Sequence, residues 1–402
     1  MSFAMGLIGC GVMGRRHVIG MKQLKAAGKL NFDLVAVCDI MPANLLKMAD
    51  HAEELLGTRP QQFADFDSML KAMKLDGIIV TTSPEMHVEV AEKAFDVGIH
   101  VMVEKPITLT VAEGVRLVEA GKKANRKLAV AENYRRDPIN RLGKAVVESG
   151  AIGTPFLATQ ESSGGGEFVI ITPWRHRKDR GGIVIDMGVH YTDILEFYLG
   201  PIDTVVGMNA IVDKQRTDQQ GVAHEADAED LSVGVMRFQS GAIANWLLNV
   251  AGRGEGSFSR MIYGTGGSLA IPGDRTGKPL RLVQRREGKD VTVEQEDLLK
   301  LVPDFHLDDV TAALFKGDRL TTYDMTWADI DANLLGIEQS DFVDAAVNNR
   351  EPEVTGEQGL RSLALMFGLL ESELLKRMVT LDEVLAGKDS PYQAEIERGL
   401  KA

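Results

Sequence analysis

The sequence predicts an α/β protein in two parts: a doubly wound parallel sheet, followed by an α+β domain with a large, mostly antiparallel, open sheet. Up to about residue 131, short apolar runs alternate with helical patterns. This alternation is typical of a parallel sheet with helices on both faces. From about residue 132, strand-like stretches separated by Gly, Asp and Asn dominate, as in antiparallel sheets. We therefore divide the chain into domains 1–131 and 132–402.

The elements of domain 1–131 are expected to follow one another as strand and helix. The expected strands are residues 4–9, 34–38, 77–82, 100–103 and 127–131. The expected helices are residues 15–27, 42–56, 66–73, 87–97 and 111–125. Ligands of such sheets bind at the carboxyl ends of the strands, so the segments that follow the strands are the first place to look for a site.

Domain 132–402 is expected to place helices on one face of its sheet. A helix over 137–148 begins at Asp137-Pro138, since proline favours the first helical position. The other expected helices are 186–199, 327–348 and 357–376, and the expected strands are 156–162, 204–212, 231–239, 242–251, 260–263, 268–271 and 280–284. Residues 213–230 are expected to form a surface loop, 273–297 a hairpin with a long excursion, and the last twenty residues a polar amphipathic tail.

The composition excludes several classes of protein. With 44% hydrophobic and 26% charged residues over 402 positions, the chain is typical of a globular protein with a large core. A net charge of −13 argues against binding to nucleic acid or to anionic membranes. No signal-peptide pattern and no membrane-spanning run of about 18 apolar residues is visible. Cys10 and Cys38 are interpreted as small core residues, so we expect a cytoplasmic protein.

The first expected strand leads into the pattern Gly9-x-Gly11-x-x-Gly14. In a Rossmann dinucleotide-binding unit, the first glycine permits a tight turn, the second lets a pyrophosphate approach, and the third lets helix and strand pack closely. Val12 and Met13 would then open the helix whose free N–H groups bind phosphate. The alternative is an ordinary strand–turn–helix unit whose glycines are structural.

Asp39 follows the second expected strand and precedes Ile40, Met41 and Pro42. An acidic side chain at this position can bind both hydroxyls of an adenosine ribose and would repel a 2′-phosphate. Because no arginine follows Asp39 directly, the sequence favours NAD over NADP.

Small polar residues follow the third and fourth expected strands. Thr81, Thr82, Ser83 and His87 lie where a diphosphate or nicotinamide ribose should bind, although Ser83-Pro84 could also be a turn that caps the next helix. Glu104 and Lys105 end the following strand ahead of Pro106. Lys105 could bind a substrate hydroxyl and stabilise negative charge on its oxygen, or act as an acid or base. Alternatively, it pairs with a surface carboxylate, and Pro106 could be cis or trans.

A helical pattern in the second domain carries Asp186, His190 and Asp193 at positions i, i+4 and i+7. These side chains share one helix face. His190 is a natural acceptor for an alcohol proton, and Asp186 could orient its ring or stabilise its charged form. A metal site built on this face, or polar groups that are merely satisfied in the core, are alternatives.

Two further segments supply candidate substrate ligands. Trp174 and Arg175 lie in a basic, aromatic stretch that leads into the Asp186 helix. Trp174 could stack on a sugar ring or a nicotinamide, and Arg175 could bind hydroxyls or a carboxylate. Asn133, Tyr134 and Arg135 follow the last strand of the first domain, where Asn133 and Tyr134 could contact a ribose or substrate hydroxyls.

In this order, the motifs resemble the glucose–fructose oxidoreductase/inositol dehydrogenase (Gfo/Idh/MocA) family. The matching residues are the glycine motif, Glu104-Lys105-Pro106, Glu132-Asn133-Tyr134-Arg135, Gly181-Gly182 and Asp186-x-Gly188-x-His190-x-x-Asp193, with later echoes at Gly264-Thr-Gly-Gly267 and Thr355-Gly-Glu357. The resemblance implies an NAD(P)-binding domain and an α+β domain whose open sheet carries subunit contacts. It also maps the family's catalytic Lys, Asp and His onto Lys105, Asp186 and His190. Arg180-Gly-Gly in place of three glycines, and extra charged loops, depart from the family pattern.

The resemblance implies oxidation or reduction of a secondary alcohol of a sugar or polyol. In this interpretation His190 exchanges the hydroxyl proton, Lys105 holds the same oxygen, and Asp186 orients the pair. The expected ligand is a small sugar or polyol substrate, and no metal is expected. The expected assembly is a homodimer or homotetramer. Two alternatives remain open: an enzyme that retains NAD and cleaves glycosides through a transient 3-oxo sugar, and a non-catalytic dinucleotide sensor.

Overall fold

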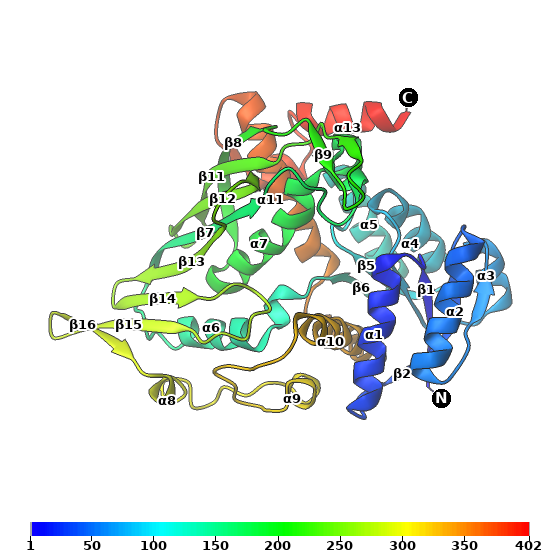
Figure 1. The fold of residues 1–402 in the computed structure, drawn as a ribbon, viewed down its shortest axis with the longest axis horizontal. Helices are drawn as coiled ribbons and strands as arrows, with labels where there is room; N and C mark the ends of the chain where they lie inside the picture. Colours follow the sequence, from blue (N-terminus) through cyan, green and yellow to red (C-terminus); the bar gives the residue numbers. More distant parts are fainter. Residues whose placement is uncertain (1, 402) are drawn as a thin grey trace.

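The first domain of this computed structural model, which describes residues 2–401, is built on a six-stranded parallel sheet (Figure 1). The strand order is β3-β2-β1-β4-β5-β6. The strands are β1 (Phe3–Ile8), β2 (Phe32–Cys38), β3 (Gln61–Phe63), β4 (Gly77–Val80), β5 (His100–Glu104) and β6 (Leu128–Ala131). The order reverses between β1 and β4, and ligands of doubly wound sheets bind at such a switch point. The short strand β3 was not expected, because its residues are largely exposed and lack an apolar run.

The helices of this domain lie close to the predicted positions. They are α1 (Val12–Ala26), α2 (Pro42–Leu56), α3 (Phe66–Ala72), α4 (His87–Asp96) and α5 (Val111–Ala124). Helix α1 begins three residues earlier than expected, inside the glycine motif, with Gly11 as its N-cap. The N–H groups at the start of α1 therefore lie directly at the carboxyl end of β1.

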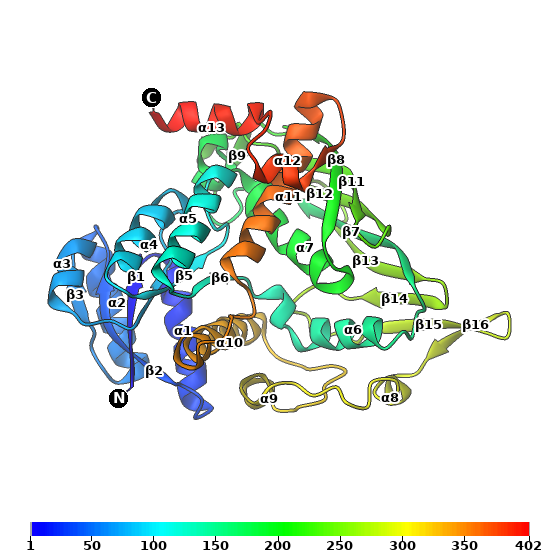
Figure 2. The same cartoon turned by 180° about the vertical axis from the view of Figure 1, so that it is seen from behind.

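Helix α10 (Trp327–Asn348), which the sequence placed in the second domain, packs against α1 (Figures 1 and 2). The two backbones approach closely at Gly20 and Gly336: a Cβ on Gly20 would lie 2.9 Å from the Gly336 nitrogen. A segment more than 300 residues from α1 thus completes the packing of the first domain.

The second domain contains a nine-stranded sheet of order β16-β15-β14-β13-β7-β12-β11-β8-β17. Its strands are β7 (Pro155–Gly165), β8 (Ile202–Ala210), β11 (Leu231–Phe238), β12 (Ile243–Gly252), β13 (Ser257–Gly264), β14 (Gly267–Ile271), β15 (Arg281–Arg286), β16 (Lys289–Val293) and β17 (Val379–Thr380). Strands β7 and β12 pair in parallel, and all other neighbouring strands of this sheet pair antiparallel. The expectation of a mostly antiparallel sheet is confirmed.

Helices α6 (Pro138–Glu148), α7 (Ile183–Leu199) and α11 (Gly356–Leu375) contact this sheet (Figure 2). Asp137 caps α6 as expected, because its carboxylate accepts a hydrogen bond from the N–H of Ile139. Strand residues of the sheet alternate between buried and exposed, and Met208, Val233 and Val235 remain exposed. One face of the sheet is therefore open.

Two segments are more ordered than expected. Residues 213–230 contain the hairpin of β9 (Gln215–Thr217) and β10 (Ala223–Glu225), and the Arg216 guanidinium is buried 2.8 Å from the Asp230 carboxylate. The tail contains α12 (Leu381–Leu385) and α13 (Pro391–Lys401), whose Tyr392 and Ile396 are buried. The remaining short elements are α8 (Gln295–Leu298), α9 (Asp309–Phe315), and the single turns η1 (Pro84–Met86), η2 (Tyr134–Arg136), η3 (Pro173–His176) and η4 (Lys178–Arg180).

Both cysteines are buried free thiols, as expected. Across residues 2–401, no helix combines the length and the apolar character that crossing a bilayer requires.

Candidate active site

A cavity of about 410 Å³ lies where the carboxyl ends of the parallel strands meet η3 and α7. Many of the predicted site residues line it: Gly11, Val12, Met13, Thr81, Thr82, Ser83, Glu104, Lys105, Asn133, Trp174, Arg175 and His190. The fold thus joins both groups of candidates, those from the parallel sheet and those from the second domain, around one space.

The glycine motif forms the turn that the sequence predicted. Gly9 has φ +97°, and a Cβ on it would lie 2.8 Å from the backbone of Thr81 and Thr82. A Cβ on Gly14 would lie 2.2 Å from the Gly9 carbonyl oxygen, whereas a Cβ on Gly11 would meet nothing within 4 Å. Gly9 and Gly14 are required by packing, and the open space in front of Gly11 can admit a phosphate.

Asn133 adds a second feature that fits a dinucleotide. Its side chain lines the cavity, and its buried amide oxygen has no hydrogen-bond partner among residues 2–401. A buried acceptor without a partner costs free energy, so a donor on a bound ligand would satisfy it. The residues present therefore fit a dinucleotide.

Asp39 lies beside the glycine turn. Its carboxylate accepts hydrogen bonds from the backbone N–H groups of Cys10 and Met41, both at 2.7 Å. Ile40, also predicted as a cofactor ligand, is 82% exposed. Asp39 therefore fixes the turn against the end of β2 while its carboxylate remains at the tip of that strand.

His87 does not occupy the position that the sequence assigned to it. The side chain is fully buried, between the carbonyl oxygens of Ile107 at 3.1 Å and Thr82 at 3.3 Å. Burial lowers the pKa of His87, which favours the neutral ring. The expectation that His87 contacts the cofactor is wrong in this structure, because the ring supports the segment that carries Thr82 instead.

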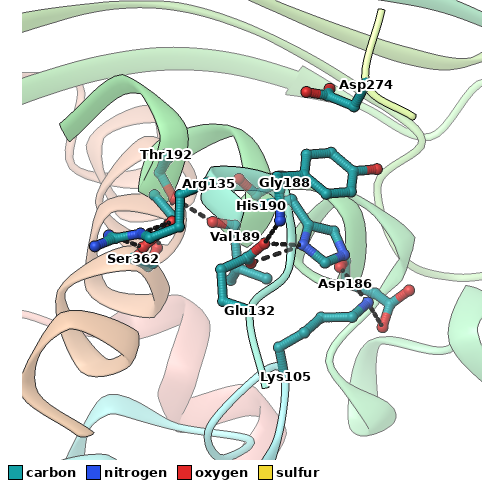
Figure 3. A network of polar contacts seen from close by, with 12 residues as sticks. Lys105, Glu132, Arg135, Asp186, Gly188, Val189, His190, Thr192, Asp274 and Ser362 are labelled. Carbon is teal, nitrogen blue, oxygen red and sulfur yellow. Dashed lines mark hydrogen bonds and ion pairs between the residues drawn. The ribbon is translucent and has the colours of Figure 1, made fainter. Parts of the chain in front are cut away.

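Lys105 and Asp186 form one half of the polar centre (Figure 3). The Lys105 ammonium donates to the Asp186 carboxylate at 3.1 Å and to its backbone oxygen at 2.9 Å, and Arg175 donates to the same carboxylate at 3.2 Å. Burial by itself would raise the pKa of the Asp186 carboxyl, but the two cations outweigh burial and hold that pKa below its ordinary value. The Lys105–Pro106 bond is cis.

His190 and Glu132 form the other half (Figure 3). The Nδ1 atom of His190 lies 2.7 and 2.8 Å from the two carboxylate oxygens of Glu132. Burial would raise the pKa of Glu132, but the charge and hydrogen bond of His190 outweigh it and lower that pKa. The expectation that Asp186 orients the His190 ring is therefore wrong: Glu132 does so. Sequence reasoning noted Glu132 in a motif without giving it a role, although its place at the end of β6 was a usable signal.

Tyr134 and Arg135 also differ from expectation. The ring of Tyr134 stacks on His190, with centroids 4.2 Å apart and an interplanar angle of 5°. Arg135 is buried and forms a two-pronged pair with Asp193. Neither side chain lines the cavity. Their predicted role as direct substrate ligands is not supported: Tyr134 packs on the histidine, and Arg135 neutralises a buried carboxylate.

The three side chains of α7 that the sequence singled out diverge toward different partners. Asp186 contacts Lys105, His190 contacts Glu132, and Asp193 contacts Arg135. A metal site on this helix face would need the three side chains to converge on one ion, so the alternative of a metal site built on α7 is not supported.

Among the charged and aromatic residues of the cavity, three were not predicted: Arg16, Arg275 and Trp327. Arg275 follows β14, and Trp327 opens α10. Arg16 could have been suggested by its place on α1 beyond the glycine motif. Arg275 and Trp327 carry no local pattern that indicates a site, because only the packing of distant segments brings them there.

Comparison with known proteins gives matches over most of the chain. Residues 3–132 match the family described as an oxidoreductase family with an NAD-binding Rossmann fold. Residues 141–270 match the GFO/IDH/MocA C-terminal domain. The two matches follow one another in the chain, as the two parts of the fold do.

The chain is also similar to named dehydrogenases over most of its length. It is 26% identical to the D-apiose dehydrogenase of Paraburkholderia graminis over 370 residues, which cover 90% of this chain and 86% of that protein. It is 25% identical to the myo-inositol 2-dehydrogenase of Thermotoga maritima over 381 residues, covering 94% and 99%. The solved structure of levoglucosan dehydrogenase with NADH and levoglucosan matches with a TM-score of 0.76 at 20% identity, covering 95% of this chain and 100% of that one. This last likeness concerns the fold alone.

Proposed function

This chain belongs to the GFO/IDH/MocA family of NAD-binding oxidoreductases, and we propose that it interconverts a secondary alcohol and a ketone of a sugar, sugar derivative or inositol-like polyol. The observation that best supports this function is the single cavity that contains both the glycine turn and the pair Lys105 and His190. A dinucleotide held at the turn and a substrate held at this pair would share that space.

The side chains divide the proton chemistry among them. His190 accepts the hydroxyl proton during oxidation, and Glu132 stabilises the imidazolium that forms. Lys105 donates a hydrogen bond to the same hydroxyl oxygen and stabilises negative charge on it. Asp186 positions the Lys105 ammonium, because it binds that group through both its carboxylate and its backbone oxygen. NAD, when bound, supplies the hydride acceptor.

The residues favour NAD over NADP. Asp39 places a carboxylate at the tip of β2, where it can accept hydrogen bonds from ribose hydroxyls and would repel a 2′-phosphate. The N–H groups at the start of α1, from Val12 and Met13, would bind the diphosphate. Initial rates with each nucleotide test this preference, and faster turnover with NADP⁺ at equal concentration would contradict it.

We also infer a homodimer or homotetramer that pairs through the open face of the nine-stranded sheet. Met208 is 77% exposed there, and Val233 and Val235 are 42% and 45% exposed. Contiguous exposed apolar side chains on a sheet face are typical of an interface. Light scattering measures the mass of the particle, and we expect Val235→Glu to shift it toward the monomer.

The test of the function is a panel of sugars, inositols, anhydrosugars and glycosides with NAD⁺, in which nicotinamide reduction and aglycone release are followed together. Reduction with one class of polyol supports the dehydrogenase. Aglycone release without net reduction would indicate the glycoside-cleaving alternative, and tight NAD binding without either signal would indicate a sensor.

His190→Ala provides the matching prediction for the site. We expect it to lower kcat by about 100-fold or more, because a positioned proton acceptor contributes that much. NAD affinity, measured by calorimetry, should survive. Equal loss of NAD binding would mean that His190 is structural.

A further inference from the structure

Four cationic side chains line the cavity of a chain whose net charge is −13: Arg16, Lys105, Arg175 and Arg275. Among the residues that line it, Glu104 is the one carboxylate. Glu104 accepts a hydrogen bond from His17 at 2.8 Å and from the Lys105 backbone N–H at 3.2 Å, so its oxygens already have donors. The wall of the cavity is therefore cationic, in contrast to the acidic molecule as a whole.

The four cations share only two carboxylates behind the wall. Asp186 accepts hydrogen bonds from both Lys105 and Arg175. Asp331 on α10 accepts hydrogen bonds from both Arg16 and Arg275.

Glu104 and Glu132, which lie near Lys105, bring the carboxylates around the four cations to four. Each cation thus has a counter-charge nearby, but Asp186 and Asp331 are each shared between two cations. Guanidinium N–H groups on the cavity wall are therefore available to an anionic group on a ligand.

Arg275 is fixed by an ion pair, a hydrogen bond and two aromatic rings. Its guanidinium donates to Asp331 at 2.9 Å and to the Tyr134 hydroxyl at 3.0 Å, and it lies 4.9 Å from the Tyr134 ring centre and 5.2 Å from that of Trp327. Tyr134 in turn stacks on His190. Arg275 and the proposed proton acceptor therefore contact the same aromatic ring, which fixes the position of the cation relative to the reacting hydroxyl.

Arg175 lines the same cavity and is fixed by a separate group of residues. It lies 4.4 Å from the centre of the Trp174 ring and donates to the Thr172 hydroxyl at 2.6 Å and to Asp186. A planar guanidinium held in this manner loses little entropy when it binds a planar anion. Both arginines are thus pre-ordered before a ligand arrives.

We propose that the substrate is a sugar acid: a sugar or polyol that carries a carboxylate, bound by Arg275 together with Arg175. The proposal rests on the proposed dehydrogenase function and narrows its substrate class. A carboxylate matches the guanidinium geometry, and it adds one negative charge beside the carboxylates already present, whereas a phosphate monoester adds nearly two at neutral pH.

The experiment compares matched substrates on the full chain with NAD⁺: D-galacturonate against D-galactose, and D-gluconate against D-glucitol. We expect kcat/KM to favour the acid by at least about 10-fold, as for a charged hydrogen bond in a desolvated site. Galactose 6-phosphate distinguishes the two kinds of anion, and its preference over galacturonate would overturn the carboxylate assignment. Preference of the wild-type protein for the neutral partners would overturn the proposal.

The variants are Arg275→Met, Arg275→Lys and, as the matched control, Arg285→Met. Arg285 is 55% exposed on the β15–β16 hairpin and pairs with Asp290, so its loss removes the same charge away from the cavity. Arg275→Met should reduce the acid preference to about 1-fold, Arg275→Lys should retain part of it, and Arg285→Met should leave it unchanged. Equal effects of Arg275→Met and Arg285→Met would overturn the proposal.

Calorimetry with the same acids in the presence of NADH separates this proposal from the proposed function. Acid binding that Arg275→Met weakens, without any turnover, would support the anion site and contradict the dehydrogenase. Turnover of neutral polyols alone would support the dehydrogenase and contradict the anion site. If no acid is bound and none is turned over, the proposal is overturned.

Discussion

His190 is held from two sides by residues of η2 and the end of β6. Glu132 fixes its Nδ1 atom, and the ring of Tyr134 covers one of its faces. The opposite ring nitrogen is thereby left for a ligand in the cavity, which is the arrangement that a proton acceptor needs. Lys105 is fixed in the same way by Asp186.

Glu132→Gln tests the role of the carboxylate. The amide keeps the shape of the side chain but cannot stabilise a positive charge on His190, so we expect kcat to fall by about 100-fold while NAD affinity is retained. Glu338→Gln is the matched control. Glu338 is buried, neither of its carboxylate oxygens has a hydrogen-bond partner among residues 2–401, and burial raises its pKa well above the ordinary value. A neutral amide should replace such a group without a loss of activity. Similar losses in both variants would indicate a general effect of buried glutamates.

At the scale of elements, α7 carries both Asp186 and His190 and packs against α11. The two helices approach closely at Gly188, which lies between Asp186 and His190 in the sequence. A Cβ on Gly188 would lie 2.4 Å from the Cε atom of Met366 on α11. The position of the two catalytic candidates therefore depends on a small residue that touches neither.

Gly188→Ala should destabilise the protein by about 1–3 kcal/mol through overpacking. Met366→Ala by itself leaves a cavity in the core. Because the atoms nearest to Gly188 belong to the flexible end of Met366, the double variant Gly188→Ala/Met366→Ala should lose less stability than the sum of the two single losses. Denaturant unfolding measures both. A double variant whose loss equals the sum of the two single losses would show that the two residues are not coupled.

Helix α13 contacts the segment that leads into the cavity. The Lys178 ammonium of η4 lies 3.8 Å from the centre of the Tyr392 ring and pairs with Glu395, and the backbone N–H of Tyr392 donates to Glu371 at 2.9 Å. The tail thus holds η4 against α11.

Truncation of the chain after Gly387, which removes α13, should therefore raise the KM for the sugar by about 10-fold. The reason is that a small misplacement of the substrate-binding segment around η4 is costly. NAD affinity should change less. Glu395→Gln removes only a partly exposed ion pair, which contributes little, and should change KM by less than about 2-fold. An unchanged KM in the shortened chain would show that α13 does not position the loop.

At the scale of the whole molecule, a half-buried and a buried histidine, His100 and His176, predict how stability depends on pH. Burial lowers the pKa of His100 and of His176 to about 4 from an ordinary value of 6.5. In the fold, the Nε2 atom of His176 accepts a hydrogen bond from the Ile170 N–H at 2.9 Å, which requires the neutral ring. Their stabilising effect is fully present above pH 6.5 and is lost as the pH falls toward 4, because the unfolded state binds protons first.

We therefore expect the Tm to decrease steadily between pH 6.5 and pH 4, by roughly 2–4 °C for each kcal/mol lost. In His100→Gln/His176→Gln this decrease should be shallower, although the Tm at pH 7 is lower. Thermal melts across this range measure both slopes, and parallel curves for the two proteins would contradict the assignment.

The local features of the site were predictable because they depend on neighbours in the sequence. The glycine motif, the strand ends that carry Lys105 and Asn133, and the spacing of Asp186 and His190 could all be read from the chain. The partners of these residues could not, because Glu132 and His190 lie 58 positions apart and their pairing depends on how β6 and α7 pack.

The sequence by itself determined the two-part α/β architecture, the dinucleotide turn and the candidate pair Lys105 and His190, since periodicity and motif spacing are local properties. Only the tertiary structure decided that Glu132 is the partner of His190, that α10 packs on the first domain, and that Arg275 reaches the cavity. The reason is physical: which buried charge meets which counter-charge depends on the approach of distant segments, and no local pattern encodes that approach.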